Sequence, residues 1–496
     1  MIRYQLIVLV NPSDVPGTGR LIDHFFIMNH PNKKVYGLIL SALLVLSLIT
    51  ASCSERIKDS RPRPNFILIV TDDQDADSLR FMPKTQRRVI EKGITFTNAY
   101  VTSSACAPSR GSILTGRYPR NTGITKKYQQ LHGINEEKTI ATILHKAGYR
   151  NILLGKYVNQ YGKTHPKYIP KGWDEWHAMI DENKYYNYRI NENGEIVQYG
   201  DAREDYITDV VSTKAAGFLD SADKEKPFFL FINTVAPHTP STPAPEYNNE
   251  FNNIPISYSF EDDISDKPKW VQNFRMLNES LIRNYFGNSQ KMEDLYRNRW
   301  RTLLSVDDMI DNIMSHLEKN GLLGNTYLFL VSDNGDGLTK HIPVSAKLSP
   351  YDEGIRVPFI AMGPSIQGNI QVDNLVSTVD ILPTLADLAG VKSVDNVDGR
   401  SLVPLLTNSA QVSGWRESIF AELPHIDNTW PWKSTPPSYQ LMRTQKFKYI
   451  EYETGEREYY DLVNDPNEME NLYNTLSPET QTNLSLELRK LAEGRQ

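Results

Sequence analysis

Two pairs of residues with oxygen-bearing side chains follow two apolar runs of the sequence. Asp72-Asp73 comes after Phe66–Thr71, and Asp333-Asn334 comes after 326–332. Continuous apolar runs of this kind predict buried parallel strands, and α/β sheets bind ligands at the carboxyl ends of their strands. The hard carboxylate oxygens of Asp72 and Asp73 suit Ca²⁺ or Mg²⁺. Taken singly, each pair has a plainer interpretation, which is an Asx turn, a helix cap or a hairpin turn.

Basic side chains follow two further predicted strands. A strand over 151–154 ends in Gly155-Lys156, and a strand over 227–234 is followed by His238. Taken alone, Lys156 would be interpreted as a surface lysine and His238 as a loop residue. Their positions at the carboxyl ends of predicted strands instead favour a place beside the carboxylates, at one edge of one sheet.

The most distinctive stretch surrounds a cysteine. Cys106-Ala107-Pro108-Ser109-Arg110 is followed, after four residues, by Thr115-Gly116-Arg117. A single cysteine would by itself be interpreted as a small buried apolar residue. Here a helix is predicted over 109–114 with Pro108 near its first turn, and the amino terminus of that helix would supply positive potential beside Cys106.

This stretch resembles the signature of the type I sulfatases. The resemblance implies that Cys106 is oxidised to formylglycine (3-oxoalanine) by a formylglycine-generating or an anaerobic sulfatase-maturating enzyme. The aldehyde hydrates, one hydroxyl attacks the sulfur of a sulfate ester and the alcohol leaves. The second hydroxyl then expels sulfate and restores the aldehyde. A thiol has no second group that could release the sulfate, so the chemistry requires the modified residue.

The resemblance also assigns a metal site. One Ca²⁺ ion is expected at the residue derived from Cys106, with further ligands from Asp72, Asp73, Asp333 and Asn334. The ion would polarise a sulfate oxygen and lower the pKa of the hydrate. Arg110 would hold the hydrate and offset its charge.

Sulfate contacts are carried over in the same way. Lys156 and Lys347 are expected to bind the sulfate, and His238 is expected to help protonate the leaving alcohol. Gly337 stands where the glucosamine-6-sulfatases have a histidine, and His341 is the candidate for that role. The chain also has Tyr157-Val158-Asn159 where many members of the family continue with Trp-His.

Three stretches outside the signature carry a closer resemblance to the N-acetylglucosamine-6-sulfatases. They are Gly172-Trp173-Asp174-Glu175-Trp176 with Lys184-Tyr185-Tyr186-Asn187-Tyr188, Ala244-Pro245-Glu246-Tyr247, and the residues from Arg299 to Asp308. The implied reaction is removal of 6-O-sulfate from N-acetylglucosamine units of glycosaminoglycans. The substitution at Gly337 leaves sulfate esters at other positions, or on other glycans, as the alternative.

The family resemblance implies an α/β fold with an alkaline-phosphatase-like large mixed sheet flanked by helices. The catalytic domain is predicted over 64–410. After Trp415 the pattern changes to short strands and a terminal helix, which predicts a smaller antiparallel subdomain over 411–496. Glu422 and His425 precede or link its strands and are candidates for lining a sugar pocket.

Residues 1–53 are predicted to be an export signal of the lipoprotein type. A basic stretch precedes the apolar run 35–49, which is shorter than the ~20 residues that a membrane-spanning helix needs. The run leads to Cys53, in a context that resembles a bacterial lipoprotein processing site. Met28 is a candidate start, and 54–63 would be a polar tether. The protein is therefore predicted to be exported, either to the periplasm or with a lipid anchor on a bacterial membrane; plain secretion and a retained signal anchor are the competing interpretations.

Composition bounds the remaining function classes. The 496 residues carry a formal net charge of −6, so no global basic field attracts nucleic acid, and a sulfated polymer would need a local basic patch. The two cysteines require no disulfide framework. Two rival functions are a phosphoesterase of the same superfamily and a non-catalytic glycan-binding lipoprotein. A phosphoesterase would typically carry a Thr or Ser nucleophile and two metals, and neither rival needs a modified cysteine.

Overall fold

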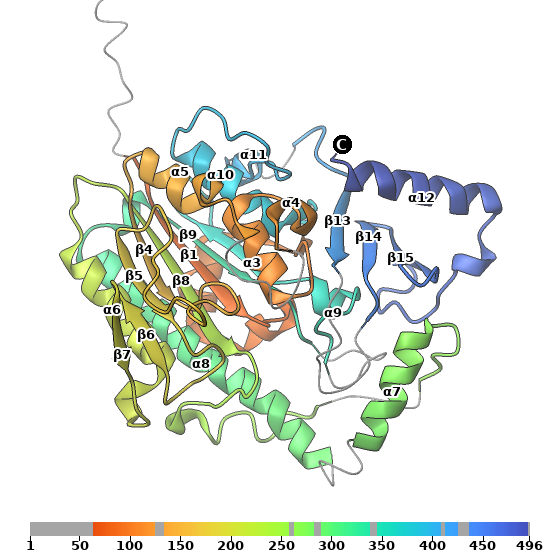
Figure 1. Cartoon of the computed structure of the whole chain (residues 1–496), viewed down its shortest axis with the longest axis horizontal. Coiled ribbons are helices and arrows are strands. Elements are labelled where there is room, and N and C mark those ends of the chain that lie inside the picture. The colour runs from red at the N-terminus through yellow and green to blue at the C-terminus, as the bar shows by residue number, and fades with distance from the viewer. Residues whose placement is uncertain are drawn as a thin grey trace, which may run out of the picture. The chain divides into compact units, whose positions relative to one another are not determined.

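A mixed sheet carries the strand ends on which the predicted site depends. The computed structural model describes residues 63–124, 133–256, 262–281, 289–337, 345–407, 412–424 and 436–494. Ten strands of these residues form the sheet, in the order β11-β2-β10-β9-β1-β8-β4-β5-β6-β7 (Figure 1). Its middle is parallel: β1 (Asn65–Asp72) lies between β9 (Thr326–Ser332) and β8 (Phe228–Pro237), and β4 (Arg150–Gly155) follows β8. The carboxyl ends of these four strands therefore meet at one edge.

The outer strands extend the sheet on both sides. Next to β4 lie β5 (Glu175–Met179), which is parallel to it, and the antiparallel β6 (Arg189–Glu192) and β7 (Glu195–Gln198). Next to β9 lie the antiparallel β10 (Phe359–Met362), then β2 (Ile94–Phe96) and β11 (Ile370–Val372). A separate parallel pair joins β3 (Ala99–Tyr100) to β12 (Val376–Ser377).

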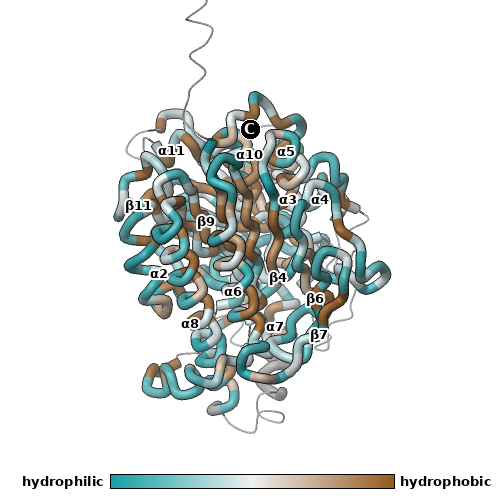
Figure 2. The backbone as a smooth tube through the Cα atoms, turned by 90° about the vertical axis from the view of Figure 1, so that its left-hand side faces the viewer, coloured by the Kyte–Doolittle hydropathy of each residue, from teal (hydrophilic) through white to brown (hydrophobic). Residues whose placement is uncertain are grey.

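Helices cover both faces of the sheet. Successive side chains of β1 point to opposite faces, so Phe66, Leu68 and Val70 belong to one apolar core and Ile67 and Ile69 to the other. The first core includes residues of α3 (Cys106–Thr115), α5 (Ile140–Lys146) and α10 (Ile381–Leu388). The second includes residues of α6 (Ile207–Ser221) and α8 (Ser289–Lys319). Figure 2 shows the hydrophobic strands, among them β4, between these layers.

Five further helices are found in the described residues. They are α2 (Pro83–Arg88), α4 (Pro119–Thr122), α7 (Lys269–Leu281), α9 (Asp352–Ile355) and α11 (Val403–Thr407). No helix among the described residues is long and apolar enough to cross a membrane. The apolar run 35–49, Met28 and Cys53 lie outside the described residues.

The C-terminal part is a small antiparallel sheet with one helix, as the sequence predicts. Its strands are β13 (Ser418–Leu423), β14 (Tyr439–Thr444), β15 (Phe447–Tyr452) and β16 (Arg457–Asp461), in that order, followed by α12 (Pro478–Ala492). One face packs Phe420 and Met442 against α12, whereas Ile419 and Leu441 on the other face join the core of the large sheet. This continuous core joins both parts into one unit from Pro62 onwards. The predicted boundary at 410/411 falls among residues outside the description.

The predicted fold class is confirmed, with local differences. α2 ends at Arg88 and is followed by a short 3-10 turn at Ile90–Lys92. β2 and β3 follow closely in sequence but pair with different partners. The helix expected to begin at 109 begins at Cys106 itself.

Candidate active site

The ends of β1 and β9 bring the two oxygen-bearing pairs together. The Asp73 amide donates to Asp333 Oδ1 at 3.1 Å, and Asn334 Nδ2 donates to Asp73 Oδ1 at 2.7 Å. Asp72, Asp73, Asp333 and Asn334 are all at least 98% buried. Asp73 has a φ of 69°, in the left-handed region that non-glycine residues rarely adopt. The chain therefore turns sharply between the two carboxylates.

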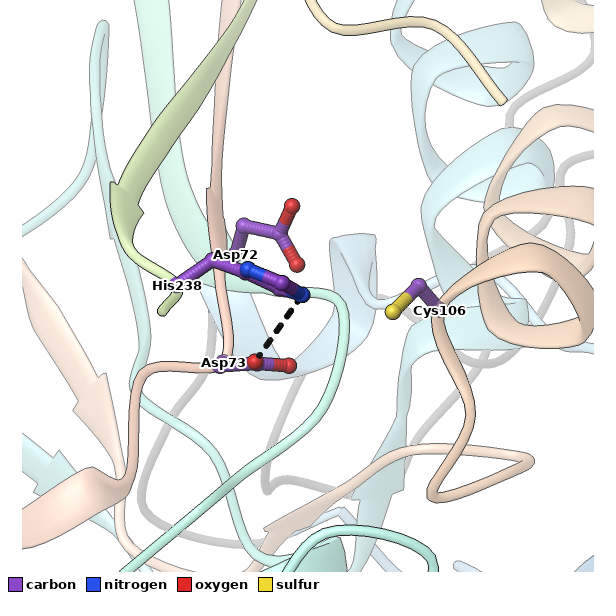
Figure 3. Close-up of side chains that lie close together, drawn as sticks. All are labelled: Asp72, Asp73, Cys106 and His238. Atoms are coloured by element: carbon purple, nitrogen blue, oxygen red, sulfur yellow. Dashed lines mark ion pairs between the residues drawn. The ribbon is translucent and has the colours of Figure 1, made fainter. Parts of the chain in front are cut away.

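Cys106 faces these carboxylates from the first turn of α3. Figure 3 shows its sulfur directed towards Asp72, Asp73 and His238, which project from the opposite side. One ligand atom from each of these four residues lies within 4.8 Å of the other three. The structure therefore brings Cys106 together with side chains from the ends of β1 and β8.

Two buried acceptors test whether the cluster suits a cation. Asp72 Oδ1 and Asn334 Oδ1 are buried and have no hydrogen-bond partner among the described residues. Buried polar oxygens are normally paired, so two unpaired acceptors in one cluster require an explanation. A hard divalent cation satisfies such oxygens directly. The donor set formed by Asp72, Asp73, Asp333 and Asn334 therefore fits the calcium site that the resemblance implies.

Three predicted cationic residues surround the same carboxylates. Arg110 Nε donates to Asp333 Oδ2 at 2.7 Å, and its Nη1 donates to Asn233 Oδ1 at 2.9 Å. Lys347 Nζ lies 2.6 Å from Asp73 Oδ1. Lys156 Nζ forms an ion pair with Asp72. All three side chains are at least 95% buried, so these charges act at close range with little water to screen them.

The buried charges shift the protonation of the site. Burial raises the pKa of the Cys106 thiol to about 11. Burial, with the charge of Asp72, raises the pKa of Asp333 to about 6. Burial opposes ionisation of Asp72, but Lys156, His238 and Arg110 hold its pKa well below the ordinary value. At neutral pH the cysteine is therefore a neutral thiol beside ionised carboxylates.

His238 lies at the end of β8 and faces Asp73. Its Nε2 is 3.6 Å from Asp73 Oδ2, and its Nδ1 is 2.5 Å from the carbonyl oxygen of Thr239. Burial, with the charge of Lys347, lowers the pKa of His238 to about 4. In the neutral ring, the carbonyl of Thr239 fixes the proton on Nδ1 and leaves Nε2 as an acceptor. Nε2 can donate to a substrate only when the ring carries a second proton.

Other residues hold these groups in place and were not identified from the sequence. Asn183 Oδ1 accepts from Lys156 Nζ at 3.2 Å, and Tyr185 Oη donates to the carbonyl of His238 at 2.8 Å. Both come from the segment between β5 and β6. Tyr185 falls in a stretch that the sequence comparison singles out, whereas Asn183 carries no signal because its role depends on where this segment meets Lys156.

The remaining predicted site residues lie elsewhere or outside the description. Glu422 is on β13, where Arg120 Nε donates to its Oε2 at 2.9 Å. The carboxylate of Glu422 is thus paired with Arg120, and no described hydrogen bond joins Glu422 to the Cys106 cluster. His341 and His425 lie outside the described residues, as does the loop 338–344 that follows Gly337.

A comparison with protein families decides between a sulfatase and a phosphoesterase, the two enzyme classes that share these carboxylates. The family model described as "Sulfatase" matches residues 64–391. The chain belongs to the sulfatase family. A second model, "N-sulphoglucosamine sulphohydrolase, C-terminal", matches residues 346–494, which include the antiparallel sheet. The protein is a sulfuric ester hydrolase, as the Cys106 signature predicts.

Relatives of this sulfatase include N-acetylglucosamine-6-sulfatases. The enzyme of that name from Capra hircus is 34% identical over 470 residues, which cover 85% of this chain and 82% of the goat protein. The extracellular sulfatase SULF-1 homolog of Drosophila melanogaster is 36% identical, over 73% of this chain and 33% of the fly protein. The predicted resemblance to the N-acetylglucosamine-6-sulfatases is thus confirmed.

Solved structures share the fold over most of the chain. One, described as a complex with its substrate D-glucosamine-2-N,6-O-disulfate, has a TM-score of 0.75 and 25% identity, covering 87% of this chain and 98% of the other. The phosphonate monoester hydrolase of Agrobacterium radiobacter has a TM-score of 0.70 and 18% identity, covering 88% and 96%. The fold is therefore common to sulfatases and phosphonate hydrolases.

Proposed function

We propose that this sulfatase removes 6-O-sulfate from N-acetylglucosamine units of glycosaminoglycans. The observation that carries the reaction is the placement of Cys106 opposite Asp72, Asp73 and His238, with ligand atoms within 4.8 Å of one another. The sugar is supported by the N-acetylglucosamine-6-sulfatases at 34% identity. It is also supported by the structural relative described with a glucosamine disulfate.

The nucleophile that we propose is the hydrate of formylglycine derived from Cys106. A thiol with a pKa of about 11 is almost entirely protonated at neutral pH, and reactive cysteines normally have a lowered pKa. The thiol also has no second group with which to expel sulfate from a covalent adduct. A gem-diol at the same position has that group, so the modified residue suits the site better than the thiol.

Asp72, Asp73, Asp333 and Asn334 would hold Ca²⁺ beside residue 106. When bound, the ion supplies Lewis-acid chemistry by polarising oxygen atoms of the sulfate and of the hydrate. Arg110, which here donates to Asp333, would orient the hydrate between this carboxylate and the sulfate. Asp333, which accepts a hydrogen bond from Arg110, is the candidate acceptor of the hydrate proton.

Lys156, Lys347 and His238 would bind and release the ester. The ammonium groups of the two lysines form ion pairs with Asp72 and Asp73, beside the position that we propose for the sulfate. Fixed positive charge favours the more negative transition state over the singly charged ester. The negative charge of a bound sulfate raises the pKa of His238, so that the doubly protonated ring donates through Nε2 to the leaving alcohol.

A substrate panel tests this proposal. The matured enzyme is expected to release sulfate from N-acetylglucosamine 6-sulfate, and not from a 2-sulfated uronic acid or a 4-sulfated galactosamine. The Cys106→Ala variant is the matched control and should be inactive, while peptide mass analysis should find the aldehyde at position 106. A reversed preference would overturn the sugar assignment alone. Hydrolysis of phosphate esters in preference would support the phosphoesterase, and glycan binding with an unmodified Cys106 and no sulfate release would support the binding lipoprotein.

We also propose export with a lipid anchor at Cys53, which rests on the apolar run 35–49 and the cysteine that follows it. Metabolic labelling with a radioactive fatty acid and cell fractionation test this. The wild-type protein should be labelled and recovered with membranes, whereas Cys53→Ser should be unlabelled. An unlabelled wild-type protein in the soluble periplasmic fraction would contradict the anchor and leave export in place.

A further inference from the structure

Arg299 of α8 contacts the backbone of the site at Asp73. Its Nη2 donates to the carbonyl oxygen of Asp73 at 2.7 Å, and its Nη1 lies 2.5 Å from Asp336 Oδ2. The side chains of Arg299 and Asp336 are each 6% exposed. One guanidinium therefore joins α8 to a metal-site residue and to the segment that follows Asn334.

Asp336 continues this connection to the sulfate-binding lysine. Its Oδ1 accepts from the Lys347 amide at 3.0 Å and from Ser345 Oγ at 2.5 Å. The two oxygens of one carboxylate thus contact Arg299 on one side and the Lys347 segment on the other. Asp73 and Lys347, whose side chains form an ion pair with each other, are also joined through their backbones by this Arg299–Asp336 bridge.

The bridge acts where the backbone is strained. The φ of 69° at Asp73 is unfavourable for a residue with a Cβ atom, and such conformations persist only where surrounding contacts impose them. The hydrogen bond from Arg299 to the Asp73 carbonyl is one such contact. The bond from the Gln74 amide to Ser332 Oγ, at 2.9 Å, is another on the next residue.

We infer that Arg299 and Asp336 are positioning residues that fix Asp73 as a metal ligand and Lys347 as a sulfate ligand in one rigid arrangement. This rests on the proposed function, because it assumes that Asp73 binds calcium and Lys347 binds sulfate. Groups that orient metal ligands typically change metal affinity or activity by about 10- to 100-fold when they are replaced. Lysine keeps the charge of Arg299 but lacks the planar fork that reaches two acceptors at once.

Arg301 provides a matched control on the same helix. Counted over the whole residue, Arg301 is 6% exposed and Arg299 is 5% exposed. Arg301 also donates to a backbone carbonyl, that of Glu250, at 2.8 Å. Its other partners are the side-chain oxygens of Asn298 and Asn252, which belong to no part of the proposed site. Arg301→Lys should therefore reproduce the structural cost of the substitution without the effect on the metal site.

Calorimetric titration of CaCl2 into the full chain with Cys106 unmodified measures the metal site without turnover. Arg299→Lys is expected to weaken calcium binding about tenfold or more, and Arg301→Lys by less than twofold. Equal binding by wild type and Arg299→Lys overturns this inference alone. No calcium binding by the wild type overturns the metal assignment of the proposed function and this inference with it.

The contribution of Asp336 to sulfate binding is measured as KM of the matured enzyme. Asp336→Asn is expected to raise KM for the 6-sulfated sugar about tenfold, because the Lys347 segment loses a charged acceptor, while Asp336→Glu restores part of the loss. An unchanged KM in Asp336→Asn overturns the role in sulfate binding. If Arg299→Lys does not fold, as judged by circular dichroism, this KM decides the inference.

Discussion

Replacing Tyr439 by phenylalanine removes one hydroxyl group that joins three distant segments. Tyr439 Oη lies 2.6 Å from Ser104 Oγ and donates to the carbonyl oxygen of Ser349 at 3.0 Å. Ser104 is two residues before Cys106, and Ser349 is two residues after Lys347. All three groups are at least 97% buried. The C-terminal sheet thereby joins the segment that leads to Cys106 to the segment that follows Lys347.

The expected cost follows from these two hydrogen bonds. Each buried bond contributes about 0.5–1.5 kcal/mol net, so Tyr439→Phe should lower the free energy of unfolding by about 1–3 kcal/mol. The larger effect should be on catalysis, because displacements of ~1 Å between reacting groups cost up to about a hundredfold in rate. We expect kcat for sulfate release to fall about tenfold or more.

Tyr452→Phe is the control for this variant. Tyr452 is paired directly with Tyr439 across β14 and β15, and each of the two residues is 3% exposed. The hydroxyl group of Tyr452 donates to Glu458 Oε2 at 2.8 Å. Urea unfolding should show that both variants are destabilised, whereas sulfate release should fall only in Tyr439→Phe. If both variants lose the same fraction of kcat, the hydroxyl of Tyr439 has no positioning role and the reasoning is refuted.

Four further predictions concern single groups of the site or its surroundings. Lys347→Met should lower kcat/KM about a hundredfold, or ~3 kcal/mol, and an unchanged value would exclude its sulfate contact. His238→Ala should slow hydrolysis of the sugar sulfate far more than that of 4-nitrophenyl sulfate, whose alcohol leaves without a proton; equal losses would contradict proton donation. Chelation of calcium should lower the midpoint of thermal unfolding, with recovery on adding CaCl2, because the buried carboxylates lose their counter-ion; an unaltered midpoint would count against the metal. Burial raises the pKa of Glu353 to about 8, so the contribution of this carboxyl group to stability should fall by about 1.4 kcal/mol per pH unit between pH 6 and about 7.5, where the folded state retains a proton that the unfolded state has lost; in urea unfolding, the difference in stability between wild type and Glu353→Gln should show this slope, and parallel curves would disprove it.

The strand ends of the site could be predicted from the sequence because buried parallel strands are continuous apolar runs. The strand over Thr326–Ser332 has the predicted bounds, and Asp333-Asn334 follows it directly. By contrast, α7 lies in a stretch that the sequence analysis leaves without a structure. Among its described side chains, Trp270 and Val271 are buried and Phe274 packs against the same core. Their spacing is that of an apolar helix face, but polar residues separate them, and this pattern was not used in the sequence analysis.

The residues that support the site could not be predicted in the same way. Arg299 and Tyr439 act through contacts across more than 200 residues of sequence, and those contacts depend on how α8 and β14 pack against the strand ends. Tyrosine and arginine on such elements are common, and nothing in their local sequence indicates their partners. Asp72 and Cys106 were recognisable because their neighbours in sequence form a motif.

The complete burial of Cys106 has a consequence for how the enzyme is produced. Its exposed fraction is 0%, and every residue of α3 is buried. If Cys106 is oxidised to formylglycine as we propose, the oxidising enzyme would have no access to the side chain once α3 has packed, and maturation would compete with folding of the nascent polypeptide. Chains that fold first would be stable but permanently inactive. The specific activity of a preparation should therefore rise when synthesis is slowed or when the maturating enzyme is co-expressed in excess, at constant yield of folded protein.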